Sequence, residues 1–136
     1  MMKTKIVGIL FFLVLGFQVS YGQSYRFKTS GFSVLEKNER GSWGKWTDLD
    51  LVNLMVTLDT NKNRIVVYSQ RIQLFKIMEY QPAEENDTDI VYSFTCTDNE
   101  GVSCTVSIIT RKKQDNRKQL YINYEDRIIV YNIFNM

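Results

Sequence analysis

Residues 90–108 read IVYSFTCTDNEGVSCTVSI, and they give the clearest indication of how the chain folds. Apolar and polar side chains alternate on both sides of residues 99–101, which is the pattern of two strands joined by a hairpin. A type I turn followed by a left-handed glycine is a common three-residue connection. This turn sets Cys96 opposite Cys104. We therefore predict an antiparallel hairpin in which both strands turn their apolar residues to one face.

The same alternation recurs along most of the chain and predicts about eight strands. β-Branched and aromatic side chains, which favour strands, occupy every second position in each segment. Polar turn residues separate the segments, and Gly31 is expected to bend the first of them. The expected strands lie at residues 25–35, 52–58, 64–69, 72–80, 90–96, 102–108, 119–124 and 127–134.

Short connections between these segments favour an antiparallel meander, because strands that are neighbours in sequence usually pair. A meander of about eight strands must bury one face and protect its two edges. Closure into a barrel meets both needs at once. We therefore predict a single all-β domain that closes into a small β-barrel. A two-layer β-sandwich of the same strands is the alternative.

Residues 1–22 have the three parts of an export signal. Two lysines lie near the start, an apolar run fills residues 6–17, and small side chains precede a cleavage point at Gln23. The apolar run is well short of the roughly 20 residues that span a bilayer. We predict a signal peptide at 1–22, an exported domain at 23–136 and a periplasmic or secreted location. An uncleaved membrane anchor is the alternative.

The residues around the expected cleavage point resemble those of bacterial exported proteins. This resemblance implies a bacterial source, and it covers only the end of the predicted signal at residues 21–23.

Charge and composition argue against several classes of function. The chain has 17 basic and 15 acidic residues, and Lys3 and Lys5 of the predicted signal account for the excess. The exported domain is therefore nearly neutral, which gives no support for nucleic-acid binding. Histidine, the commonest general base and transition-metal ligand, is absent. We expect no enzyme activity, no metal and no cofactor.

Cys96 and Cys104 are the two cysteines of the chain. In an exported protein a disulfide persists, and the predicted hairpin places the two residues within bridging range. We predict a disulfide between them. The alternative is a pair of buried, reduced thiols that act as small apolar side chains.

Trp43 and Trp46 lie in a polar, glycine-containing stretch between the first two expected strands. Two amphipathic rings beside flexible glycines are suited to stacking on a flat ligand. They are the predicted ligand-binding residues. The alternative is that both rings close a barrel end or cover the core.

Charged residues gather in two loops. The basic loop is predicted to bind a partner, with affinity that falls as salt rises; a solvated turn is the alternative. Its residues are Arg111, Lys112, Lys113, Arg117 and Lys118. The acidic loop is expected to be solvated, with calcium binding or glycosidase-type catalysis as alternatives. Its residues are Glu84, Glu85, Asp87 and Asp89.

Together these patterns predict an exported, non-catalytic β-domain that binds a small molecule or a glycan. The alternative is a protein-interaction module, such as an inhibitor of an envelope or extracellular enzyme, that acts through its loop tips. Once the signal is removed, we expect no membrane span and no nucleic-acid partner.

Overall fold

The computed structural model describes residues 23–136, and the predicted signal peptide at 1–22 lies outside the described residues. Within residues 23–136 the chain forms strands and turns without a helix. The strands are β2 (Ser24–Glu36), β3 (Asp50–Leu51), β4 (Met55–Asp59), β5 (Arg64–Val67), β6 (Gln73–Tyr80), β7 (Glu84–Glu85), β8 (Asp89–Asp98), β9 (Ser103–Arg111), β10 (Arg117–Asn123) and β11 (Arg127–Asn135).

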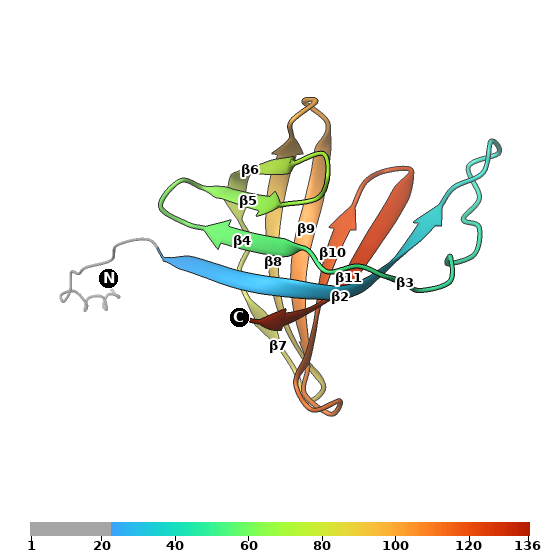
Figure 1. The fold of residues 1–136 in the computed structure, drawn as a ribbon. Coiled ribbons are helices and arrows are strands. Elements are labelled where there is room, and N and C mark those ends of the chain that lie inside the picture. Colours follow the sequence, from blue (N-terminus) through green and yellow to red (C-terminus); the bar gives the residue numbers. More distant parts are fainter. Residues whose placement is uncertain (1–22) are drawn as a thin grey trace.

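Eight of these strands form one closed antiparallel barrel (Figure 1). The order around it is β2, β4, β5, β6, β8, β9, β10 and β11, and β11 pairs back with β2. The short strands β3 and β7 add to the outside, on β2 and β8 respectively. The predicted meander barrel is therefore confirmed, and the sandwich is excluded because its two sheets would not join at β2 and β11.

The central hairpin has the predicted register. Asp98 donates its backbone N–H to the carbonyl of Val102 at 2.9 Å, and Gly101 has the left-handed φ of 83° that the turn requires. Cys96 lies directly opposite Cys104.

The predicted disulfide between these two cysteines is wrong for this structure, in which both are free thiols. Both side chains are buried on the inward face of the barrel. Burial raises the pKa of both thiols far above neutral pH, so the thiolate that must attack to form a disulfide is scarce at this position. Cys96 and Cys104 therefore act as small apolar side chains, which was the alternative.

The core fills the barrel with inward-facing residues from alternate positions of each strand. Moving one such apolar side chain out of water contributes about 1.5–3 kcal/mol. The largest apolar side chains that are almost fully buried are Phe75, Ile65, Leu120, Ile122, Val56, Val67 and Val106.

Two β-bulges change the inward alternation. On β2, Gly31 pairs with Asn132 and Thr29 pairs with Ile133, so Ser30 is left without a partner on β11. This irregularity adjoins the bend that was expected at Gly31. On β6 the second bulge falls at Met78, between residues that pair with Cys96 and Thr95. A bulge lets residues three apart lie on the same face of the sheet.

Thr29 explains why β4 begins three residues later than the alternation predicts. Its buried hydroxyl donates to the carbonyl of Val52 and accepts from the N–H of Leu54, each at 2.8 Å. These bonds replace part of the regular ladder, so the strand starts only at Met55. Val52 and Leu54 still pack against the core, as their spacing indicates.

Candidate functional site

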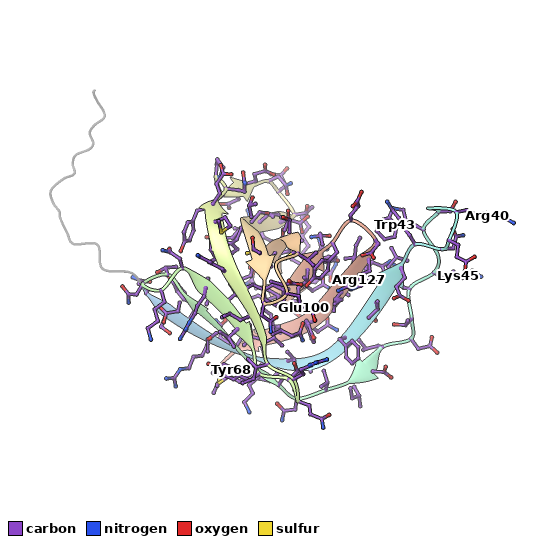
Figure 2. All side chains as sticks on the ribbon, turned by 90° about the horizontal axis from the view of Figure 1, so that it is seen from above. Arg40, Trp43, Lys45, Tyr68, Glu100 and Arg127 are labelled. Carbon is purple, nitrogen blue, oxygen red and sulfur yellow. The ribbon has the colours of Figure 1, made fainter. Side chains whose placement is uncertain are left out.

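The two ends of the barrel differ in how fully side chains cover the core. At the end that carries the β8–β9 turn, the Tyr124 hydroxyl donates to Asp98 Oδ2 at 2.8 Å. The Arg127 guanidinium lies 4.0 Å from the centre of the Tyr124 ring, a cation–π contact. Figure 2 looks onto this end, where Glu100 and Arg127 are labelled. These side chains cover the core and line a recess of about 150 Å³.

The opposite end of the barrel opens into a cavity of about 450 Å³, which we call the aromatic cavity. Its lining comes from strands β2, β4, β6, β8, β9, β10 and β11 and from Thr60, the residue after β4. In Figure 1 the β9–β10 loop near this end lies at the bottom of the view, beside β7. The lining residues are Tyr25, Phe27, Leu58, Thr60, Tyr80, Tyr92, Phe94, Ile108, Thr110, Lys118 and Asn135.

Burial divides the apolar lining into a floor and a rim. The floor is buried and consists of Phe27, Leu58, Phe94 and Ile108. The rim is exposed and consists of three tyrosines, Tyr25, Tyr80 and Tyr92. Rings of this amphipathic kind contact an apolar ligand with their faces and water with their hydroxyls. The cavity is thus apolar at its base and amphipathic at its mouth.

The bulge on β6 places Tyr80 at this rim. Ile77 and Tyr80 are three residues apart, and the bulge at Met78 turns both toward the barrel interior. The Tyr80 ring packs edge-on against Phe94, with 5.6 Å between ring centres, and its hydroxyl donates to Asn63 Oδ1 at 2.7 Å. Burial raises the pKa of Tyr80, and the negative charges of ionised Cys96 and Asp59 add to the effect. Its hydroxyl is therefore a neutral donor near neutral pH.

Lys118 is the charged residue in the lining of the aromatic cavity. It lies directly opposite Thr110 of β9 in the barrel ladder and is half-buried. Lys118 and Asn135 also line a polar recess of about 400 Å³ beside the β9–β10 loop. The lysine therefore stands at the mouth, between the apolar cavity and the outer surface.

The five residues of the basic loop have different contacts in the structure. Arg111 forms an ion pair with Asp89 at 3.2 Å, and Lys112 forms one with Glu85 at 2.5 Å. The Arg117 guanidinium donates to the side-chain oxygens of Gln114 and Asn132. Lys113 is exposed, and Lys118 lies in the cavity. Partner binding by this loop stays a prediction, and three of its members are already engaged within the chain.

The two tryptophans lie far from the aromatic cavity. Figure 2 shows Trp43 on the loop between β2 and β3, which extends away from the barrel. Lys37 Nζ lies 5.0 Å from the centre of the Trp43 ring. Trp43 and Trp46 are each 45% exposed, and neither lines a described cavity or belongs to the buried core. Ligand binding by these rings stays a prediction.

Ion pairs connect the acidic loop to the basic loop. Glu85 and Asp89 form the ion pairs with Lys112 and Arg111, and β7 pairs with β8. Within residues 23–136 no group of three or more His, Cys, Asp or Glu side chains is arranged to hold a metal ion. In the same part of the chain, no helix has the length and apolar character needed to cross a membrane.

The aromatic cavity was not predicted from the sequence. One signal for it was present: Lys118 alternates with Leu120 and Ile122, so a charge falls on an otherwise apolar inward face. Sequence proximity instead grouped this lysine with the basic loop. Tyr80 gave no such signal, because a bulge cannot be read from strict alternation.

Comparison of the chain with protein-family models, with curated proteins and with solved structures finds no match. The geometry of the barrel is therefore what supports a function.

Proposed function

We propose that this chain is an exported, non-catalytic β-barrel that binds a small, mainly apolar molecule in the aromatic cavity. The observation that carries the proposal is the cavity itself: about 450 Å³ with a buried apolar floor and three tyrosines at its rim. Ligand pockets in proteins usually measure about 300–1,000 Å³ and are lined mainly by apolar and aromatic side chains with a few polar groups.

The lining favours an apolar ligand over a glycan, the other ligand class expected from the sequence. A sugar presents hydroxyls on most of its surface, and each needs a hydrogen-bond partner when it leaves water. The floor residues Phe27, Leu58, Phe94 and Ile108 offer no such partner. An apolar body against this floor loses no hydrogen bonds and buries carbon surface.

The non-catalytic part of the proposal rests on composition and on the use of the acidic residues. The chain has no histidine, so a Ser-His-Asp or Cys-His nucleophile cannot be assembled. The aromatic cavity has no acidic residue in its lining. Glu85 and Asp89 are engaged in ion pairs. Export is proposed from the pattern of residues 1–22, and a bacterial source from residues 21–23.

A neutral fluorescent probe tests the proposal. The purified protein is titrated with N-phenyl-1-naphthylamine, whose emission rises in an apolar site. We expect saturable binding that weakens in Tyr92→Ala, which removes a rim ring that is 49% exposed. Tyr68→Ala is the matched control, because Tyr68 is 39% exposed and lines no described cavity. Equal probe binding by both variants, or none by the unmodified protein, would contradict the proposal.

A further inference from the structure

Thr110 is a buried residue in the wall of the aromatic cavity, and its hydroxyl has no hydrogen-bond partner in the described part of the chain. Thr110 is only 7% exposed, and its side chain forms no hydrogen bond with any residue in 23–136. The other buried polar side chains, Thr29, Ser107 and Gln119, are each hydrogen-bonded within the chain. Buried polar groups normally have partners, since leaving one unpaired is unfavourable. An unpaired hydroxyl in a cavity wall therefore points to a partner that the cavity receives.

Lys118 stands beside this hydroxyl. The two residues are directly opposed on β9 and β10, so their Cβ atoms lie on the same inward face about 4.5–5.5 Å apart. Among residues 23–136, Lys118 forms neither an ion pair nor a side-chain hydrogen bond. Its neighbours in the basic loop, Arg111 and Lys112, already hold the nearby carboxylates of Asp89 and Glu85.

We infer that the ligand of the aromatic cavity is an amphipathic organic anion, whose carboxylate binds Lys118 and Thr110 while its apolar body lies on the aromatic floor. This inference rests on the proposed function of the cavity. A carboxylate has two oxygens that accept several hydrogen bonds, and an ammonium and a hydroxyl supply matching donors. Both donors lie at the mouth side of the lining, which leaves the floor for the apolar body.

Other occupants fit the two residues less well. A neutral apolar molecule leaves the lysine without a counter-charge and the hydroxyl without a partner. A cation would meet Lys118 and find no acidic residue in the lining. A polyanion would use the whole basic loop, but three of its five residues are engaged within the chain.

The test compares two ligands that differ in their head group alone. Decanoate and decanol each displace N-phenyl-1-naphthylamine from the purified protein near neutral pH. We expect decanoate to bind about tenfold more tightly than decanol, because hydrogen bonds to a charged group are the stronger kind. Lys118→Met should abolish this preference while decanol binding persists, which also shows that the cavity of the variant is intact. Thr110→Val should reduce the preference in part.

Lys113→Met is the matched control, since it removes one positive charge from the same loop outside the cavity. The preference for decanoate should survive in this variant. Equal affinity of the unmodified protein for both ligands, or an unchanged preference in Lys118→Met, would overturn the inference and leave the proposed function standing. An equal loss of preference in both lysine variants would overturn it too, because long-range charge would then explain the effect. Failure of the neutral probe to bind at all would remove the proposed function as well.

Discussion

The Tyr124 hydroxyl donates a hydrogen bond to Asp98 Oδ2 and so joins the β10–β11 turn to the β8–β9 turn across the closed end of the barrel. Asp98 also accepts the backbone N–H groups of Glu100 and Val102, each at 2.9 Å. One carboxylate therefore holds the shape of its own turn and attaches it to the neighbouring one.

Tyr124→Phe removes the hydroxyl and keeps the ring under Arg127. We expect the free energy of unfolding to fall by about 1 kcal/mol, which is the usual net contribution of one hydrogen bond. The fall should be somewhat larger than this because the acceptor, Asp98, is charged. Urea unfolding measures the change. Tyr68→Phe is the control, because Tyr68 is exposed and its hydroxyl has no hydrogen-bond partner among residues 23–136. Equal losses in both variants would show that the Tyr124–Asp98 bond does not stabilise the fold.

The Asp98 carboxylate also makes the stability of the fold depend on pH in the acidic range. Burial raises the pKa of Asp98, but the hydrogen bonds from Val102, Tyr124 and Glu100 outweigh it and lower the pKa below the ordinary 3.8. The folded protein therefore holds this proton less tightly than the unfolded chain. The stabilisation is present above the ordinary pKa and is lost as pH falls through the lowered one. Unfolding midpoints measured across this acidic range should fall less steeply for Asp98→Asn than for the unmodified protein.

The two thiols should be unreactive while the protein is folded. Burial raises the pKa of Cys96 to about 12 and that of Cys104 to about 11, with the charges of Cys104 and Asp98 adding to the respective shifts. The thiolate is the reactive form, so native protein near pH 8 should react slowly with a thiol reagent such as iodoacetamide. After unfolding without a reductant, both should be alkylated quickly. Mass spectrometry that found neither alkylated would show that a disulfide forms after all.

A substitution in the core should mainly lower stability, whereas a substitution at the rim of the aromatic cavity should mainly weaken ligand binding. Leu120 is fully buried, so Leu120→Ala should lower the free energy of unfolding by about 2–5 kcal/mol through lost contacts and the space left behind. Tyr92→Ala removes an exposed rim ring and should cost less than about 1 kcal/mol, since surface substitutions usually cost little. At temperatures where both variants are folded, Tyr92→Ala should weaken probe binding more than Leu120→Ala does. A larger loss of stability in Tyr92→Ala would place this ring in the core.

Much of the fold could be predicted because alternation and turn chemistry are local. The residues of the β8–β9 turn, ending in Gly101, determine the register that sets Cys96 opposite Cys104. The start of β4 could not be predicted in this way, because the hydroxyl of Thr29 takes over the backbone groups of Val52 and Leu54 from more than 20 residues away.

The cavity was missed for a related reason. Alternation shows which residues face inward, but it does not show where an interior is left unfilled, since that depends on how eight strands close. Tyr25 and Tyr92 therefore read as ordinary strand residues. The inward charge of Lys118 was visible in the sequence, and its meaning became clear only when its cross-strand neighbour, Thr110, was known.

Closure of the barrel has a consequence for how the chain reaches this fold. Lys28 of β2 pairs with Phe134 of β11, so the ring of strands closes only when two segments far apart in the sequence meet. Contacts between such distant segments carry a large entropic cost before they form, which makes folding slow. A nascent chain that lacks β11 has two open strand edges and an uncovered interior. Such a chain should therefore stay unfolded until β11 is available to pair with β2.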